Sequence, residues 1–248
     1  MAYLVAAAER RDLGAIQRSA PETWRRVRRY NLPIQLALSA AEELMTSSSD
    51  PATAAVISLA PCRPGSADLY RWGDVVTSGM ASGSLGDLRM NPTQTLHAVD
   101  NLAMSAFAIT YGNHADCLGL GGAAGQAWCG LEAVLERLEG GRDEAIEEAL
   151  LMAGDQDTSD ESASGIGIAL LFSRRRRPCA AGGNFLRLIR IERRPLSSPA
   201  TVLPHAALGL SEFVAATRMK PPGLLCYDVP AEQTDGLSAV NIVIEISS

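Results

Sequence analysis

The segment that most constrains the fold of this 248-residue chain is a short strand that turns through glycines into a helix. The strand is expected at Cys117–Gly121 and the helix at Ala124–Leu138, and residues 121–125 between them read GGAAG. Many α/β enzymes place a nucleophile at such a turn, because it exposes one side chain at the positive N-terminus of a helix. This turn has no serine, cysteine or threonine. The missing nucleophile is the main functional clue in the sequence.

Around this segment, strand and helix patterns alternate along the chain. The run Ala54–Ala60 is apolar on both sides, which is typical of a strand buried on both faces of an α/β sheet. Gly165–Phe172 and Leu186–Ile191 are expected to form a hairpin. The sequence thus predicts one α/β domain over residues 1–248. Further strands are expected at Tyr3–Ala8, Glu147–Ala153 and Ala239–Ile246, and helices at Pro33–Met45, Ala67–Gly79, residues 91–111 and Leu208–Met219.

Composition and charge exclude several classes of protein. The net charge of −6 argues against nucleic acid as the main partner, because phosphate binding needs a basic face. The apolar run at the N-terminus is too short for a membrane span or a secretion signal, so a cytoplasmic protein is expected. Five widely spaced cysteines without a CxxC pair indicate neither a disulfide framework nor a zinc site. The acidic stretch Asp155–Glu161 is interpreted as a solvated loop without fixed metal-ligand spacing.

Several short motifs follow one another in a characteristic order, namely Asn91-Pro92, residues 97–103 (HAVDNLA), residues 108–112 (AITYG), Ala123-Ala124-Gly125 and the strand Ala149–Gly154. Their order resembles the ketoacyl synthases of the thiolase-like superfamily, and more narrowly the short ketoacyl-synthase-like proteins of polyketide and aryl-polyene pathways. The resemblance is firm over Leu32–Phe172 and thin after that. It implies a thiolase-like layered fold, with helices packed around a mixed sheet and truncated relative to full ketoacyl synthases.

Two departures from the family pattern point to a subunit without catalytic activity of its own. Gly122 falls where the resemblance places the nucleophilic cysteine. The family also needs two histidines from the second half of its fold, and this chain has only His97, His114 and His205. The resemblance therefore implies a chain-length-factor-like subunit, without cofactor or metal, that pairs with a full-length ketoacyl synthase.

Other side chains leave two alternatives open. Cys117 is the thiol nearest to Gly122, but five residues of extended strand separate them by roughly 16–18 Å, so it is interpreted as a packed strand residue. His114 is interpreted as an ordinary loop histidine. If either were reactive, the chain would be a minimal acyl-transfer or hydrolytic enzyme with an unconventional nucleophile. A homodimeric scaffold protein is the other alternative.

The resemblance also implies two contact surfaces. Family dimers join across the strand that leads to the glycine turn, and the helix Thr95–Tyr111 would line that interface and shape an acyl tunnel. The basic run of residues 174–177 has two open interpretations, namely a charged hairpin turn or a contact for an acidic acyl carrier protein. The interface residues are Asp116, Cys117, Leu118, Gly119, Leu120 and Gly121, and the basic ones Arg174, Arg175, Arg176 and Arg177.

Overall fold

The computed structural model describes most of the chain. Its described residues are 1–48, 50–60, 77–78, 81, 102–120, 127–140, 146–156, 164–177, 185–195, 206–218, 220–233 and 236–247. The helix predicted at Ala67–Gly79 lies almost entirely outside these residues. No helix within the described ranges is long and apolar enough to cross a membrane.

Eight strands form one mixed sheet in the order β3-β2-β4-β5-β1-β6-β8-β7. β3, β2 and β4 run parallel, whereas β5 is antiparallel to both of its neighbours, β4 and β1. The strands are β1 (Ala2–Arg10), β2 (Ala55–Leu59), β3 (Cys117–Leu120), β4 (Glu148–Gln156), β5 (Gly165–Ser173), β6 (Phe185–Pro195), β7 (Gly223–Gln233) and β8 (Gly236–Ser247).

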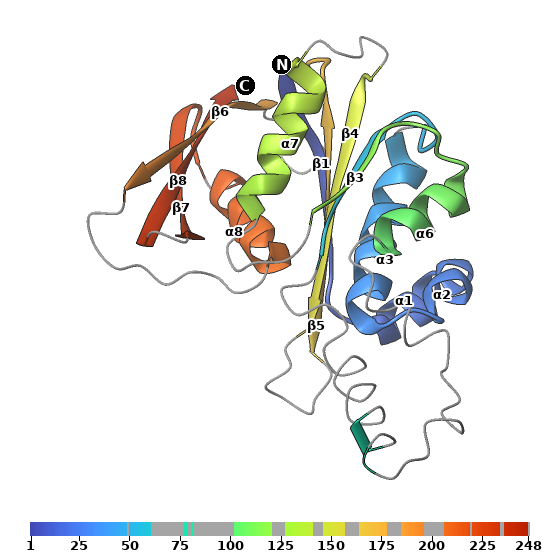
Figure 1. The fold of residues 1–248 in the computed structure, drawn as a ribbon. Coiled ribbons are helices and arrows are strands. Elements are labelled where there is room, and N and C mark those ends of the chain that lie inside the picture. The colour runs from blue at the N-terminus through green and yellow to red at the C-terminus, as the bar shows by residue number, and fades with distance from the viewer. Residues whose placement is uncertain are drawn as a thin grey trace.

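Helices cover both faces of the first five strands of this sheet. One face carries the N-terminal helices together with α6, and the other carries α7 and α8 (Figure 1). The helices are α1 (Leu13–Ser19), α2 (Pro21–Val27), α3 (Leu32–Ser48), α6 (Leu102–Tyr111), α7 (Ala127–Glu139) and α8 (Ala206–Arg218).

Alternate residues of the central strands feed two separate hydrophobic cores, because successive side chains of a strand point to opposite faces. On β4, Leu151 and Ala153 belong to the core beneath α7 and α8, whereas Leu150 and Met152 belong to the core beneath α3 and α6. All five residues of β2 are buried, as the apolar run predicted.

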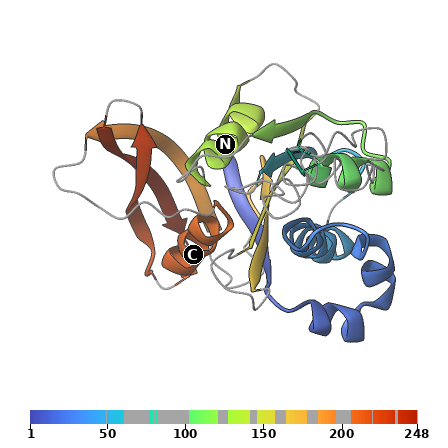
Figure 2. The same cartoon turned by 60° about the horizontal axis from the view of Figure 1, so that its bottom comes forward.

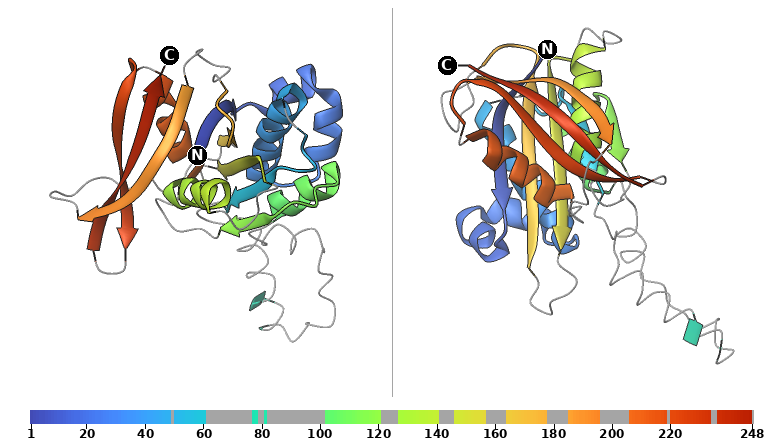
Figure 3. Two further views of the ribbon diagram at one scale, coloured as in Figure 1. Left: turned by 90° about the horizontal axis from the view of Figure 1, so that it is seen from above. Right: turned by 90° about the vertical axis from the view of Figure 1, so that its left-hand side faces the viewer.

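The last three strands form a further layer. β6, β8 and β7 curve away from the rest of the sheet and close over α7 and α8, which therefore lie between two layers of strands (Figures 2 and 3). Ile242, Ile244 and Ile246 of β8 join the same core as the inner residues of α7 and α8. The order of layers is thus helices, sheet, helices, sheet.

The predicted hairpin of Gly165–Phe172 with Leu186–Ile191 is wrong, because β1 lies between these two strands. β1 pairs with β5 along most of its length and with β6 at Ala2–Leu4. The register of β1 shifts between Leu4 and Ala6, and its apolar side chains change face at that point. Because β1 is covered on both faces, the backbone groups along both of its edges need hydrogen-bond partners. β5 and β6 supply these partners, one on each edge.

α3 packs unusually close to the sheet, and glycines make this approach possible. A Cβ atom at Gly167 of β5 would overlap the backbone of Leu36, and one at Gly154 of β4 would overlap the carbonyl group of Pro33. These two positions therefore have to be glycine for the helix to lie where it does.

Most of the other predicted elements within the described residues are confirmed, with ends shifted by a few residues. Gly112 ends α6 at a φ of 60°, as its position after the apolar helix face predicted. β7 was not predicted. Its run contains Pro230, which weakens a strand pattern but is tolerated on an edge strand, and β7 is the outermost strand of the sheet.

Candidate functional site

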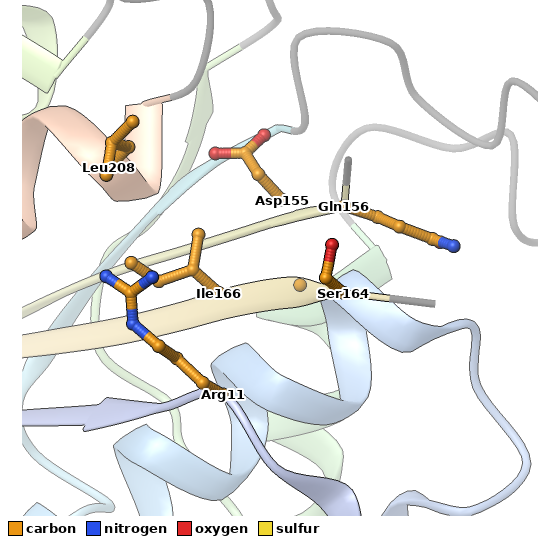
Figure 4. A pocket seen from close by; sticks show the side chains of 7 residues that line it. Arg11, Asp155, Gln156, Ser164, Ile166 and Leu208 are labelled. Atoms are coloured by element: carbon orange, nitrogen blue, oxygen red, sulfur yellow. The ribbon is translucent and has the colours of Figure 1, made fainter. Parts of the chain in front are cut away.

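The carboxyl ends of β2, β3 and β4 meet at one edge of the sheet, which is where open α/β sheets usually bind ligands. A pocket of about 180 Å³ opens at this edge, between the end of β4, the start of β5 and the start of α8 (Figure 4). It is lined by Arg11, Asp155, Gln156, Ser164, Gly165, Ile166 and Leu208.

Asp155 is the buried polar group of this pocket. Its side chain is only 2% exposed, and its Oδ2 atom accepts a hydrogen bond of 2.8 Å from the backbone N–H of Ala207. The carboxylate thus caps the N-terminus of α8, where a negative charge is stabilised. The prediction that Asp155 lies in a solvated loop is wrong, because β4 continues through this residue. The rest of that acidic stretch, apart from Gln156, lies outside the described residues.

The other polar groups of the pocket are nearer to solvent. The Nε atom of Arg11 donates to the Glu9 carboxylate at 2.5 Å. In Figure 4 the Asp155 carboxylate turns toward α8, and the Gln156 side chain points away from it. Among the described lining residues, the Ser164 hydroxyl is the only nucleophile, and no histidine accompanies it. This arrangement can bind a polar group, but among the described lining residues no histidine is present to activate the serine as a nucleophile.

Cys117 lies far from this pocket. Strand pairing through Val56 places Cys117 level with Leu150 of β4, and Asp155 is five residues further along. That separation is about 16 Å along the strands, with two strand spacings across. Cys117 also packs against the core beneath α3 and α6, whereas Asp155 points toward α8, so the two side chains occupy opposite faces of the sheet.

The surroundings of Cys117 favour the neutral thiol. Burial raises the pKa of Cys117 above its usual value, and the neighbouring Asp116 carboxylate adds to this effect. Its Sγ atom lies 3.7 Å from Oδ1 of Asn113, a buried residue whose amide donates to the carbonyl oxygens of Pro51 and Ala54. A thiol is a weak nucleophile until it is deprotonated, so this environment suits a structural cysteine.

His114 forms no site with other described residues. His114 is exposed on the loop between α6 and β3, and its backbone N–H donates to the carbonyl oxygen of Ala52 at 3.3 Å. Gly121, Gly122, His97 and His205 lie outside the described residues, so the proposal that Gly122 replaces a nucleophile remains a sequence-based prediction.

β3 forms one edge of the described sheet. Asp116 and Leu120 accept hydrogen bonds from β2, through Val56 and Ala60 at 2.9 Å each. Because alternate residues of a strand direct their backbone groups to alternate edges, Cys117 and Gly119 direct theirs away from β2. α6, which contacts β3, carries Ile109, whose side chain is 81% exposed. The predicted interface strand is therefore an edge strand of the described sheet, and the helix that contacts it carries an exposed apolar side chain.

The four arginines of residues 174–177 all have partners within the chain. Arg174 donates from Nε to the carbonyl oxygen of Leu138 at 2.7 Å and thereby caps the C-terminus of α7. Arg175 and Arg177 pair with Glu147 and Glu148 at 2.8 and 2.7 Å, and the Arg176 guanidinium lies 4.1 Å from the centre of the Phe185 ring. A contact with an acyl carrier protein at these residues stays a prediction.

The pocket at the end of β4 was not recognised from the sequence. Its signal was present, since Asp155 directly follows the apolar strand residues 149–154, and polar side chains at the carboxyl ends of parallel strands commonly line sites. The role of Asp155 depends on α8, which begins 51 residues later, and local patterns do not show such a contact.

Comparison with known proteins identifies the fold of the chain but does not assign it to a sequence family. No protein-family model matches the chain, and no curated protein matches its sequence. Among solved structures, the chain is similar to the ishigamide ketosynthase/chain length factor, with 14% identity, a TM-score of 0.61, and coverage of 94% of this chain and 85% of that one. The chain thus shares its fold with the ishigamide ketosynthase/chain length factor.

Two further structures give the same result. The complex of the ketosynthase ApeO with its chain length factor ApeC from Xenorhabdus doucetiae matches at 12% identity and a TM-score of 0.57, covering 88% of this chain and 79% of that one. The 3-oxoacyl-[acyl-carrier-protein] synthase III of Aquifex aeolicus matches at 9% identity and a TM-score of 0.52, covering 99% and 100%. The chain has the thiolase-like fold of ketosynthases, as predicted.

Proposed function

We propose that this chain is a non-catalytic ketosynthase-like subunit, similar to a chain length factor. In this proposal it pairs with an active ketosynthase and shapes the acyl tunnel in type II polyketide or fatty-acid-like biosynthesis. The observation that carries the proposal is the edge position of β3 in the described sheet, in a chain with the ketosynthase fold. The partner supplies the cysteine and both histidines, and an acyl carrier protein delivers the growing chain.

The properties of Cys117 support a non-catalytic subunit over a minimal enzyme. A cysteine that forms a covalent acyl intermediate has to be deprotonated within reach of a base, and in open α/β sheets the ligand lies at the carboxyl ends of the strands. Cys117 stands at the amino end of β3, and burial raises its pKa. Among its described lining residues, the pocket at the end of β4 offers only the Ser164 hydroxyl in place of this thiol, and no histidine accompanies it.

The backbone of β3 suggests how the two subunits join. The N–H and C=O groups of Cys117 and Gly119 point away from β2, where the described residues place no further strand, and they could pair with an extended strand of the partner, which would continue the sheet across the interface. Ile109 would be covered by the same partner, which removes an exposed apolar side chain from water.

Co-expression with the ketosynthase encoded nearest to this chain tests the proposal. We expect a one-to-one complex in size-exclusion chromatography with light scattering. Gly119→Pro removes the outward N–H group of β3 and should abolish the complex, whereas Gly119→Ala keeps that group and should leave the complex intact. Circular dichroism spectra and melting temperatures show whether each variant is folded.

Two outcomes would contradict the proposal. A stable dimer of twice 26.2 kDa that excludes the ketosynthase would favour the homodimeric scaffold. Stable acylation of the isolated chain by an acyl thioester, mapped to Cys117 by intact and peptide mass measurement, would favour the minimal enzyme. Condensing activity created by Gly122→Cys alone would also argue against a subunit that depends on its partner's histidines.

A further inference from the structure

The end of α2 carries the least neutralised positive charge of the described surface. Residues 21–30 contain Arg25, Arg26, Arg28 and Arg29 but only one acidic residue, Glu22, in a chain whose acidic residues outnumber its basic ones by 28 to 22. Arg26, which is also exposed, pairs with the buried Glu42 carboxylate and is thereby neutralised. Arg25, Arg28 and Arg29 are exposed, and we call them the α2 basic face.

Few acidic groups neutralise the α2 basic face. Arg25 pairs with Glu22 at 2.7 Å, and both side chains are about 70% exposed, so solvent screens this pair strongly. Arg29 lies 5.0 Å from the centre of the Tyr30 ring and donates to its hydroxyl oxygen at 2.9 Å. No carboxylate of the described chain pairs with Arg28 or Arg29.

The backbone beneath these arginines is held in place by α3. The side-chain amide of Gln35, a buried residue, donates to the carbonyl oxygens of Arg28 and Tyr30. The N–H of Arg28 donates to the carbonyl oxygen of Trp24 at 2.9 Å, so the helical geometry continues to residue 28. Arg25 and Arg28 are therefore neighbours on one helical face, where like charges repel without a partner.

The arginines of residues 174–177 differ from the α2 basic face in how many partners they have within the chain. Each of its arginines contacts a carboxylate, a helix C-terminus or an aromatic ring of the chain itself. An acidic partner that docked there would have to compete with these contacts. At the α2 basic face it would compete with the exposed Arg25–Glu22 pair and with the contact of Arg29 with Tyr30, but with no carboxylate of the described residues at Arg28 or Arg29.

We propose that the α2 basic face is a docking surface for an acidic protein. Resting on the proposed function above, that protein is the acidic acyl carrier protein that serves the ketosynthase pair. Charge complementarity supports this partner, because a chain with a net charge of −6 repels an acidic protein elsewhere and attracts it at a local cationic patch. A membrane surface fits less well, since Trp24 and Val27 of α2 pack against the core instead of forming an exposed apolar face.

Binding of a fluorescently labelled holo-acyl carrier protein to the purified ketosynthase complex tests this inference. The variant pair Arg28→Gln with Arg29→Gln removes two charges from the α2 basic face. The matched pair Arg175→Gln with Arg176→Gln removes two exposed charges from the other run. We expect the first pair to weaken binding by about five- to tenfold at low salt and the second to change it less than twofold. The affinity of the unmodified complex should fall as salt rises.

Three results would overturn the inference. Equal binding by the complex with Arg28→Gln and Arg29→Gln would show that the carrier docks elsewhere. A loss confined to the Arg175→Gln and Arg176→Gln pair would assign docking to residues 174–177. Stronger binding of the unmodified chain to anionic phosphatidylserine vesicles or to an oligonucleotide than to the carrier would identify another class of partner. Size-exclusion chromatography of the same samples separates these results from failure of the subunits to pair.

Discussion

The carboxylate of Asp155 accepts a hydrogen bond of 2.8 Å from the backbone N–H of Ala207, 52 residues further along the chain. This bond joins the carboxyl end of β4 to the N-terminus of α8. It fixes one wall of the pocket and positions the helix that lies between the two layers of strands. Because the carboxylate is buried, its replacement affects both helix capping and the solvation of a backbone N–H group.

Asp155→Ala is expected to lower the free energy of unfolding by about 2 kcal/mol, because it removes a buried cap. Asp155→Asn keeps an acceptor oxygen and should cost less. Urea unfolding followed by circular dichroism measures both. Glu212→Ala, at an exposed position of the same helix, is the control and should change stability by less than about 0.5 kcal/mol. Equal stability of Asp155→Ala and the control would show that the cap is unimportant.

Gly167→Ala is expected to destabilise the fold by about 3 kcal/mol, because its methyl group would overlap the backbone of Leu36. In a chain of this length, such a loss lowers the melting temperature by roughly 10 °C. Gly209→Ala in α8 is the comparison, since a Cβ there meets only the Ala127 methyl group, at 3.0 Å. Its cost should stay below about 1 kcal/mol, because alanine favours a helix over glycine. Similar melting temperatures for the two variants would contradict the close packing of α3.

Tyr111→Phe is expected to leave stability unchanged or to raise it slightly. The hydroxyl oxygen of Tyr111 is buried without a hydrogen-bond partner in the described structure, and burial raises the pKa of this phenol. Removing an unsatisfied polar group is neutral or favourable. The neighbouring Phe107, whose ring centre lies 4.7 Å away, is the contrast, and Phe107→Ala should cost about 3–5 kcal/mol. A loss above about 1 kcal/mol for Tyr111→Phe in thermal unfolding would reveal a partner for the hydroxyl.

Cys117 should react slowly with iodoacetamide at pH 8, and more slowly than the exposed Cys226. Burial raises the pKa of Cys117 from its usual value of 9.0, so little thiolate is present at that pH. The rate should rise only above pH 9, as followed by peptide mass mapping. Because the folded pKa is the higher one, the contribution of this thiol to stability is complete below about pH 9 and is lost as pH rises through the folded value. Preferential labelling of Cys117 at pH 7 would instead support the alternative of a minimal acyl-transfer or hydrolytic enzyme.

Local patterns were sufficient to predict the elements of the central sheet. The apolar run at β2 and the glycine after α6 indicated their structures, because burial on both faces and a left-handed helix end each restrict the residue types that fit. The resemblance to ketosynthases added the layered fold, which structural neighbours confirm at 9–14% identity.

Long-range contacts could not be predicted in the same way. The position of β1 between β5 and β6 depends on pairing across most of the chain, and two apolar strands separated by a basic loop look like a hairpin when β1 is not considered. The pocket at Asp155 also depends on a distant helix. A single sequence contains the apolar pattern of each strand but no direct signal of which strand lies beside it.

The central position of β1 also bears on how the protein is made. Its pairs Arg10–Gly167 and Ala2–Leu188 join residues that are 157 and 186 positions apart. Synthesis at roughly 5–20 residues per second keeps this first strand without its partners for about 10–40 s. Contacts of such high sequence separation also slow folding itself. The N-terminal strand is therefore the segment that a chaperone has most time to bind while the nascent chain is still on the ribosome.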